Sequence, residues 1–505
     1  MAIIKSIISW LNIKRMSQIE LFRKYPVEVQ METLFKLLKK AKDTEWGKMY
    51  NYENIGSIKE FQKRIPLQDY EHVTSYVNRL RNCEQNILWP SEIKWFAKSS
   101  GTTNDKSKFI PVSREALEDC HFKGGKDIIA LYLYQQPTNK LLKGKALTLA
   151  GSHQVNNFNN TSYYGDLSAV LIQNLPFWAE FLRTPNLEIT LMDEWESKIE
   201  KMAQATIKKN VTSIAGVPSW TLVLIKRILE ITGKKDFTEI WPNLELFIHG
   251  GVSFIPYREQ FKKLFLSEKM SYLETYNASE GFFAIQDDMN TQDMLLMLDY
   301  GIFYEFIPME EFGKENQKVL TIGEVETGIN YAIVISTNAG LWRYVLGDTI
   351  KFTSLYPHKI VITGRTKHFI NTFGEELIIE NAEQAIKIAS EKTSSQIREY
   401  TAGPVYMTEN SKGSHEWLFE FSTPPANIDY FMEILDNALK AVNSDYEAKR
   451  YRNMTLDFPH FTVLPDGTFY KWLKLKGKYG GQHKIPRLAN HREYIDELLK
   501  LTNKL

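Results

Sequence analysis

The stretch Trp95–Ser113, WFAKSSGTTNDKSKFIPVS, places a polar loop between two apolar runs. Its Ser, Thr and Lys residues and its Gly101 are types that hold phosphate oxygens through hydroxyls, a cation and exposed backbone N–H groups. A P-loop needs GxxxxGK followed by Ser or Thr and then a helix, but Gly101 lacks a second Gly and "KFIPV" reads as a strand. The stretch therefore predicts either a phosphate-binding loop of another type or an ordinary polar hairpin turn.

The composition is that of a globular protein with more than one domain. The chain has 505 residues, 43% hydrophobic and 24% charged, so two or three domains are expected. Its 62 basic and 61 acidic residues leave a net charge of +1, which removes the electrostatic basis for nucleic-acid binding. Cys83 and Cys120 are the only cysteines and form no CxxC pair, so a reducing compartment and a cytoplasmic location are expected.

The N-terminal segment MAIIKSIISWLNIKRM reads as an amphipathic helix. Lys5 interrupts its apolar run and no small-residue cleavage site follows, so a signal peptide is not predicted. One face of the helix carries Ile4, Ile7, Ile8 and Leu11. This face is expected to pack on the protein body, with contact to a membrane surface as the alternative. No stretch of the chain is long and apolar enough to be predicted as a transmembrane segment.

Beyond Lys94, short runs rich in β-forming residues alternate with helical segments. The runs are KALTLAG, VTSIAG, LELFIHGG and SYLETY. Among the helical segments, Pro218–Gly233 has Pro at its first position and Gly at its last, as helices prefer. This alternation predicts an α/β domain with a substantially parallel sheet.

The last third of the chain changes character twice. From about Tyr331 consecutive strands are expected, and after Gly364 a smaller α+β module. The module is expected to contain helices near 380–393 and 427–442, a strand in HEWLFEFST and a hairpin in Phe461–Leu475, FTVLPDGTFYKWLKL. The predicted division is a large domain over 1–363 and a small domain over 364–505, with a hinge near 364–370.

Two further segments deliver polar groups from predicted strand ends. In His249–Phe254, HGGVSF, paired glycines end a strand. In YLETYNASEGFF the strand is expected to end at Tyr276 and to deliver Ser279 and Glu280 into a loop. A carboxylate in such a loop is either a solvated surface acid or part of a binding site.

Two more segments follow near the predicted domain boundary. In LWRYVLGDTIKF, Gly347 and Asp348 are expected to interrupt a strand, where an acid can bind a ribose diol. The segment ITGRTKHFINTFGEEL places Arg365 and Lys367 at the boundary itself. Neither a GxSxG nucleophile elbow nor an HExxH zinc signature occurs, so a serine hydrolase or zinc hydrolase of those types is not predicted.

In this order and at these intervals, the segments resemble the core motifs of the adenylate-forming enzymes, the acyl-CoA synthetase and luciferase superfamily. Within it, SSGTT, YNASEG and NAGLWRYVLGD are similar to the auxin-responsive Gretchen Hagen family of acyl acid amido synthetases. The resemblance covers about residues 95–490. It implies a large N-terminal α/β domain of the adenylate-forming type with a smaller, mobile α+β C-terminal domain.

The resemblance also implies a role for each motif. The residues that would cradle the β- and γ-phosphates of ATP are Ser99, Ser100, Thr102, Thr103 and Lys108. Those that would line the adenine pocket are Gly250, Gly251, Tyr276, Asn277 and Ala278. Asn104 and one extra residue before Lys108 depart from the GTTGxPKG pattern of the wider superfamily, which leaves Lys106 open as a second cation.

The remaining implied roles concern the reacting phosphate and the moving domain. Ser279 would contact the α-phosphate and Glu280 would hold Mg²⁺, while Asp348 and Arg365 would bind the ribose. The hinge position matches Lys367, and the C-terminal catalytic lysine matches Lys484 in GGQHKIPR.

The implied enzyme is a ligase that forms a C–N bond. It would use ATP to adenylate a carboxylic acid, release pyrophosphate, and transfer the acyl group to an amine, expected to be an amino acid. Two alternatives stay open, an acyl-CoA synthetase that forms a thioester and a nucleotide-binding regulator without chemistry. The sequence specifies neither the acid nor the amine, and a monomer is the default expectation.

Overall fold

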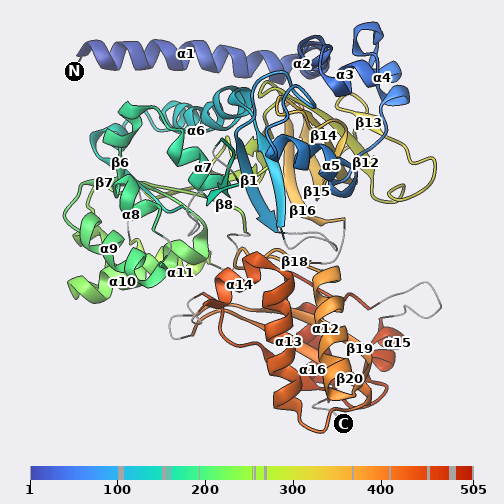
Figure 1. Cartoon of the computed structure of the whole chain (residues 1–505). Coiled ribbons are helices and arrows are strands. Elements are labelled where there is room, and N and C mark those ends of the chain that lie inside the picture. The colour runs from blue at the N-terminus through green and yellow to red at the C-terminus, as the bar shows by residue number, and fades with distance from the viewer. Residues whose placement is uncertain are drawn as a thin grey trace.

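A computed structural model describes most of the chain. The described residues are 2–100, 107–150, 156–158, 161–192, 194–252, 254, 257–266, 270–366, 369–408, 411–451, 455–476 and 485–502. Figure 1 shows a large body with helix α1 along one side and a smaller unit, formed by the last part of the chain, at the opposite end. The twelve-stranded sheet that organises the body is mixed, with helices packed around it.

Helices form the N-terminal part of the body, as the sequence predicts. They are α1 (Ala2–Lys24), α2 (Pro26–Ala41), α3 (Glu45–Met49), η1 (Tyr52–Asn54), α4 (Ile58–Arg64) and α5 (Tyr70–Arg81). Helix α1 docks through its second half, where Ile19 and Phe22 are buried and Arg15 forms ion pairs with Asp127 at 2.6 Å and Asp299 at 2.5 Å. The face from Ile4 to Leu11 lies outside the described side chains.

One half of the large sheet is parallel, as the alternation of runs predicts. Its strands, in spatial order, are β6 (Arg183–Thr184), β3 (Lys145–Thr148), β7 (Val211–Ala215), β8 (Leu246–Gly250) and β9 (Ser271–Ala278). The helical segments before and between these strands are α6 (Phe122–Gln135), η3 (Leu141–Lys143), α7 (Leu167–Gln173), η4 (Phe177–Phe181), α8 (Leu187–Thr190), α9 (Trp195–Thr206), α10 (Pro218–Thr232), η5 (Phe237–Glu239) and α11 (Arg258–Leu264). Helix α10 begins at Pro218 and ends before Gly233, which has a φ of +64°.

The other half of the sheet is antiparallel. Its strands continue in the order β10 (Gly281–Ile285), β11 (Met294–Leu296), β16 (His358–Arg365), β15 (Tyr344–Leu355), β14 (Asn330–Thr337), β12 (Ile302–Pro308) and β13 (Leu320–Thr321). Every residue of β12 and nearly every residue of β14 is buried, which fits their largely apolar sequences. The expectation of a parallel sheet therefore holds for only half of it.

A second sheet carries the polar loop of Trp95–Ser113. Its strand order is β2 (Ser107–Val112), β1 (Trp95–Ser100), β5 (Tyr163–Asp166) and β4 (Asn156–Asn157). Strands β1 and β2 pair antiparallel, with Ser99 opposite Lys108. The two apolar runs thus form a hairpin whose tip is the polar loop, and β2 continues as the strand that "KFIPV" predicts.

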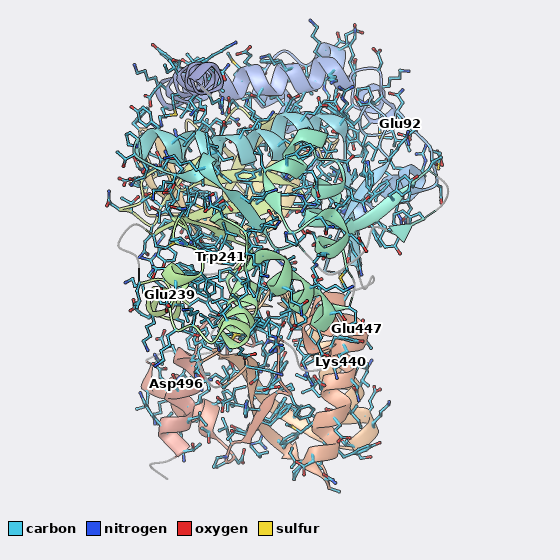
Figure 2. The ribbon with its side chains drawn as sticks, turned by 90° about the vertical axis from the view of Figure 1, so that its left-hand side faces the viewer. Glu92, Glu239, Trp241, Lys440, Glu447 and Asp496 are labelled. Atoms are coloured by element: carbon cyan, nitrogen blue, oxygen red, sulfur yellow. The ribbon has the colours of Figure 1, made fainter. Side chains whose placement is uncertain are left out.

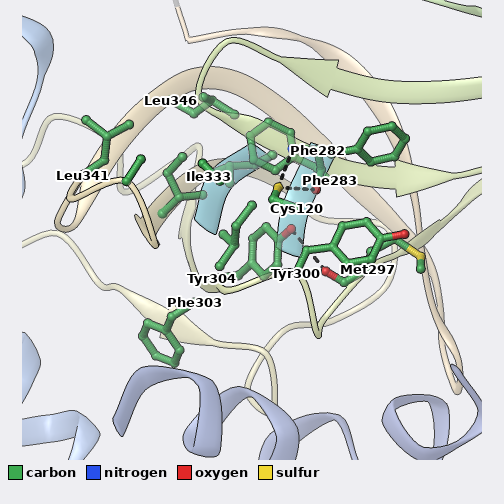
Figure 3. Packing of buried hydrophobic residues seen from close by; sticks show 14 of the residues in the cluster. Cys120, Phe282, Phe283, Met297, Tyr300, Phe303, Tyr304, Ile333, Leu341 and Leu346 are labelled. Carbon is green, nitrogen blue, oxygen red and sulfur yellow. Dashed lines mark hydrogen bonds between the residues drawn. The ribbon is translucent and has the colours of Figure 1, made fainter. Parts of the chain in front are cut away.

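Aromatic side chains fill the space beside the start of β10. Figure 3 shows Phe282 and Phe283 there, together with Tyr300 and Tyr304. Cys120 lies among them and comes from a short π-helix, η2 (Ala116–His121). The Phe282 N–H lies 3.2 Å from the Cys120 sulfur. This packing fixes the first residues of β10 and with them the turn that precedes the strand.

The C-terminal unit is a smaller α+β structure. Its strands are β17 (Phe369–Ile370), β18 (Leu377–Ile378), β19 (Gln396–Val405), β20 (Ser414–Thr423) and β21 (His460–Val463). Its helices are α12 (Ile379–Thr393), α13 (Ile428–Val442), α14 (Ser444–Arg450), α15 (Thr468–Leu475) and α16 (Glu493–Thr502). Two expected helices and the strand in HEWLFEFST are present, whereas the domain boundary itself stays a prediction.

The hairpin expected over Phe461–Leu475 is wrong. Strand β21 pairs parallel with β20, and the residues after Gly467 form helix α15 instead of a returning strand. Gly467 adopts a φ of +76° just before the helix, and Phe469 and Trp472 are buried on one helical face. Their three-residue spacing suits a helix, and burial of that face outweighed the turn signal of Asp466–Gly467.

The C-terminal unit is docked on the body through several hydrogen bonds. The Tyr257 hydroxyl donates to the Thr372 carbonyl at 3.0 Å, and the Gln260 amide donates to the Met407 carbonyl at 2.6 Å. Apolar side chains of both parts also belong to one continuous buried cluster. These contacts hold the smaller unit against the end of the body that bears the candidate site.

A buried ion pair joins the N-terminal helices to the sheet. Arg343 donates two hydrogen bonds to Glu305, at 2.9 and 3.0 Å, and two more to the carbonyls of Gln62 and Ile65, both at 2.7 Å. Both charged side chains are at most 5% exposed. We predict that Arg343→Met lowers the free energy of unfolding by about 3–5 kcal/mol, because it leaves the Glu305 carboxylate buried without a counter-ion.

Chemical denaturation measures this change. Arg114→Met is the matched control, because the Arg114–Glu118 pair is exposed and its loss should change the free energy of unfolding by less than about 1 kcal/mol. Equal effects of the two substitutions would contradict the prediction.

Candidate active site

The β1–β2 hairpin places a lysine at the candidate site. Lys108 lies opposite Ser99, and its ammonium nitrogen is 5.9 Å from the centre of the Tyr70 ring. Burial lowers the pKa of Lys108, while the nearby Glu280 carboxylate opposes that shift. Thr102, Thr103 and the open position Lys106 lie outside the described residues, as does the side chain of Ser100.

The turn between β9 and β10 carries the predicted metal ligand. Strand β9 continues through Asn277 to Ala278, two residues beyond its expected end, and Ala278 pairs with Gly281 across a two-residue turn of Ser279 and Glu280. Glu280 is only partly exposed. Burial raises the pKa of its carboxyl group to about 7, although Lys108 acts in the opposite direction.

A three-residue cluster connects β9 with β15 and β16. The Tyr276 hydroxyl donates to one Asp348 carboxylate oxygen at 2.6 Å, and Arg365 Nε donates to the other at 2.9 Å. Asp348 and Arg365 are direct neighbours in the β15–β16 ladder. The sequence predicted that Gly347 and Asp348 interrupt a strand. Strand β15 instead continues through both residues, and Gly347 lies in a bulge within it at a φ of +92°.

The cluster requires the sheet to curl. In the strand order, β9 and β15 are separated by β10, β11 and β16, which in a flat sheet corresponds to about 19 Å. The Tyr276 hydroxyl nevertheless reaches Asp348 directly. The ends of the parallel and antiparallel halves therefore face each other, and side chains far apart in the sheet meet at one place.

The paired glycines end strand β8 where it approaches β9. A Cβ atom at Gly250 would lie 2.4 Å from the Thr275 carbonyl oxygen, so only Gly fits this close approach. Gly251 has a φ of +79°, and its carbonyl accepts a hydrogen bond from Asn371 of the C-terminal unit at 3.2 Å. Gly250 is thus paired with Thr275, the residue directly before Tyr276, at the junction of the two parts of the protein.

The structure thus brings together much of the predicted nucleotide site. Lys108, Glu280, Asp348 and Arg365 are close enough for their charges to act on one another. Lys367 and Lys484 lie outside the described residues. Among the residues that the structure describes, no group of three His, Cys, Asp or Glu side chains is placed to hold a metal ion, so Glu280 would share a cation with substrate oxygens.

Two residues at the site carry no sequence signal that singled them out. His121 Nδ1 lies 3.0 Å from the Asn277 side-chain oxygen, and burial lowers the pKa of His121 to about 4, so the ring stays neutral. Glu376 lies 3.7 Å from Arg365, in the segment ITGRTKHFINTFGEEL, where the sequence pointed only to Arg365 and Lys367. His249, in contrast, stacks on Phe254 at 4.1 Å as a buried neutral ring, with its pKa lowered to about 3.

The fold is shared with solved structures of an acyl acid amido synthetase and an acyl-CoA ligase. Over 97% of this chain and 95% of the other, the structure is similar to that of GH3.15 acyl acid amido synthetase, with a TM-score of 0.61 and 16% sequence identity. It is also similar to that of 2-hydroxyisobutyryl-CoA ligase, with a TM-score of 0.57 and 12% identity over 95% and 93% of the two chains. These likenesses establish the fold alone, and they confirm the predicted fold class.

The chain belongs to the GH3 family. The model of the GH3 family N-terminal domain matches residues 15–270, that of the central domain residues 295–365 and that of the C-terminal domain residues 380–493. The chain is 22% identical to indole-3-acetic acid-amido synthetase GH3.3 of Arabidopsis thaliana, over 93% of this chain and 90% of that one. It is also 22% identical to 4-substituted benzoates-glutamate ligase GH3.12 of the same plant, over 85% and 87%. The predicted family is confirmed.

The raised pKa of Glu280 predicts a cost to stability in the ligand-free protein. Between the ordinary value of 4.5 and about 7, the folded protein retains a proton that the unfolded chain releases, so stability falls as the pH rises through this range. Glu280→Gln stays neutral throughout. We predict that it raises the free energy of unfolding at pH 8 by at most about 3 kcal/mol and that the gain disappears in acid.

Urea denaturation from pH 4 to pH 8 measures this pH dependence. Glu188→Gln, which removes an exposed carboxylate, is the control and should change the free energy of unfolding by no more than about 0.5 kcal/mol. A stability difference between Glu280→Gln and wild type that does not vary with pH would contradict the prediction.

Proposed function

We propose that this chain is an ATP-dependent acyl acid amido synthetase. It adenylates a carboxylic acid, releases pyrophosphate, and transfers the acyl group from the acyl-AMP to an amine. The observation that carries the proposal is the meeting of Tyr276, Asp348 and Arg365 with Lys108 and Glu280 at one end of a GH3-family fold. Relatives named as a glutamate ligase and as an L-amino acid synthetase support the amine as the acceptor.

The chemistry needs positive charge and alignment more than covalent catalysis. A carboxylate is a poor electrophile, and adenylation gives it a phosphate leaving group. As the carboxylate attacks the α-phosphorus, charge develops on the phosphate oxygens, and Lys108 is placed to neutralise it. Holding the acid and ATP in line removes much of the entropic cost of their encounter, which can be worth roughly 7–11 kcal/mol.

The nucleotide-binding roles follow the motifs. Phosphate oxygens would be held by Ser99, Ser100, Thr102, Thr103, Lys108 and, at the α-phosphate, Ser279. The adenine would lie against Gly250, Gly251, Tyr276, Asn277 and Ala278. The ribose hydroxyls would donate to Asp348, whose carboxylate Tyr276 and Arg365 already orient.

The Glu280 carboxylate fits a Mg²⁺ ion bound together with ATP. A hard cation prefers oxygen ligands, and a carboxyl group whose pKa is raised to about 7 is one whose negative charge lacks sufficient compensation in the ligand-free protein. The ion would supply charge neutralisation at the phosphates. Glu280 must then be ionised to bind it, so adenylation should weaken as the pH falls below about 7.

Substitution of Asp348 tests the nucleotide site. We predict that Asp348→Asn raises the KM for ATP by about 10- to 100-fold, because the ribose loses a charged acceptor and the side chain loses its pairing with Arg365. Acid-dependent exchange of pyrophosphate into ATP measures the effect. The control is Asp119→Asn at an exposed position, and an unchanged KM in Asp348→Asn would contradict the assigned role.

We further propose that residues 364–505 form a mobile domain that rotates about a hinge at Lys367, and that Lys484 acts on the α-phosphate during adenylation. Adenylation and amide formation need different groups beside the same carbonyl carbon, and domain rotation provides both arrangements. Lys484→Ala is therefore expected to abolish pyrophosphate exchange and to spare amide formation from supplied acyl-AMP. Lys500→Ala, at an exposed position on α16, is the control, and equal loss in both assays would contradict this division of roles.

A product assay separates the amide from the alternatives. The protein is incubated with ATP, Mg²⁺, a panel of aromatic and aliphatic acids, and either pooled amino acids or CoA, and the products are identified by mass spectrometry. Amides are expected. Thioesters would identify an acyl-CoA synthetase, and nucleotide binding without pyrophosphate release would identify a regulator without chemistry.

The setting in which the enzyme works is part of the same proposal. Cys83 and Cys120 are not joined in a disulfide, which is consistent with the cytoplasmic location expected from the sequence. No helix in the described part of the chain is long and apolar enough to cross a membrane. We take a monomer as the working assembly, and light scattering tests it.

A further inference from the structure

Helix α14 (Ser444–Arg450) lies at the junction between the C-terminal unit and the body. Figure 2 shows its residue Glu447 there, beside the helices of the parallel half. The Ser444 hydroxyl is 3.1 Å from the Ser107 hydroxyl, next to Lys108 in β2. The Lys449 ammonium lies 4.1 Å from the centre of the Trp220 ring on α10. One short helix thus faces both the strand of the candidate phosphate loop and the first turn of α10.

Two opposite charges on α14 are held apart. Asp445 and Lys449 are one helical turn from each other and so share a face. Neither side chain forms a hydrogen bond or an ion pair within 4.0 Å with any residue that the structure describes. The same spacing on α13 behaves differently, because Asp436 and Lys440 form an ion pair there at 2.5 Å.

The neighbouring acids are already engaged. Glu375 accepts hydrogen bonds from the backbone N–H groups of Thr372 and Phe373 and shares one with His415 at 2.9 Å. Two other acids have basic neighbours: Glu376 lies 3.7 Å from Arg365, and Asp166 is the ladder partner of Lys98. No described side chain therefore lies within ion-pair distance of Asp445 or Lys449, although the two charges act on each other and on nearby acids from farther away.

These two charges are costly in the ligand-free protein. Lys449 is only 8% exposed. Burial lowers the pKa of Lys449, against the effect of Asp445 and the other acids, and burial together with Glu376 raises the pKa of Asp445 to about 7. The Trp220 ring offsets part of the cost of the ammonium group through a cation–π contact. A ligand with both signs of charge would offset more.

We propose that the face of α14 that carries Asp445 and Lys449 is the subsite for the amino-acid acceptor, with the carboxylate of the amino acid on Lys449 and its ammonium group on Asp445. The inference rests on the proposed amido synthetase function. A zwitterion presents the two charges on neighbouring atoms, which matches a separated Asp–Lys pair, whereas a simple amine would leave Lys449 unpaired. The place is suitable for the reaction, because Ser444 lies against the strand that bears Lys108.

Kinetics with matched amines test the proposal. The probes are accepted L-amino acids and the amines that lack their carboxylate, such as L-alanine with ethylamine and L-valine with isobutylamine. Wild-type protein should have a KM at least about tenfold lower for the amino acid than for its matched amine. Lys449→Met, which keeps the length of the side chain, should raise the KM for the amino acid about 10- to 100-fold and leave that for the amine within about threefold.

The same variants distinguish amine binding from domain docking. Lys449→Arg should retain the preference for amino acids, and Asp445→Asn should raise the KM for amino acid and amine alike, because both carry the ammonium group. Acid-dependent pyrophosphate exchange, which needs no amine, should keep its KM values for ATP and acid in Lys449→Met. Lys471→Met, at an exposed position of α15, is the matched control.

Three results would overturn the proposal. The first is a Lys449→Met variant that keeps the full preference for amino acids. The second is equal loss of pyrophosphate exchange and amide formation in Lys449→Met, since that pattern identifies a docking contact. The third result applies if Lys449→Met does not fold. It is an Asp445→Asn variant whose KM for the amino acid is unchanged. Absence of pyrophosphate exchange in wild-type protein would instead overturn the proposed function, and this inference with it.

Discussion

The hydrogen bond from Tyr276 to Asp348 is the contact on which the candidate site depends. It joins β9, the last parallel strand, to β15, which lies four strands away in the sheet order. The contact exists because the sheet curls. The curl brings the ends of β9 and β15 to face each other. Arg365 completes the arrangement from β16, so the carboxylate of Asp348 is oriented before any ligand arrives. Preorganisation of this kind is how an enzyme avoids reorganising polar groups during the reaction.

Around this contact, the ligand-free protein carries charges that its own residues do not fully compensate. Glu280 has a carboxyl group with a pKa raised to about 7, and Lys449 is a buried ammonium group held apart from Asp445. Each lowers stability by itself, and each is placed where the proposed chemistry brings a complementary charge. The pattern is that of a protein whose binding site is stabilised by its substrates, with the rest of the stability supplied by packing and by pairs such as Arg343–Glu305.

Local signals in the sequence predicted local structure well and distant contacts poorly. The ends of helix α10 were predicted from Pro218 and Gly233, because the capping of a helix depends on the residues at its ends. The hairpin expected over Phe461–Leu475 is wrong because the turn signal at Gly467 precedes an amphipathic helix whose buried face has its partners elsewhere in the chain. The Tyr276–Asp348 contact and the separation of Asp445 from Lys449 depend on sheet curvature and on docking of the C-terminal unit. No short motif predicts the Tyr276–Asp348 contact or the separation of Asp445 from Lys449. Only the resemblance to a family predicted that the motifs form one site.

Transfer of an oxygen label tests adenylation most directly. A carboxylic acid with ¹⁸O in both carboxylate oxygens is incubated with the protein, ATP, Mg²⁺ and an amino acid, and the nucleotide products are analysed by mass spectrometry. If the carboxylate attacks the α-phosphorus and the amine later displaces AMP, the AMP must carry one ¹⁸O atom and the amide must retain the other. Label in inorganic phosphate, with ADP as the nucleotide product, would mean that the acid is activated at the γ-phosphate and would contradict the role assigned to this site.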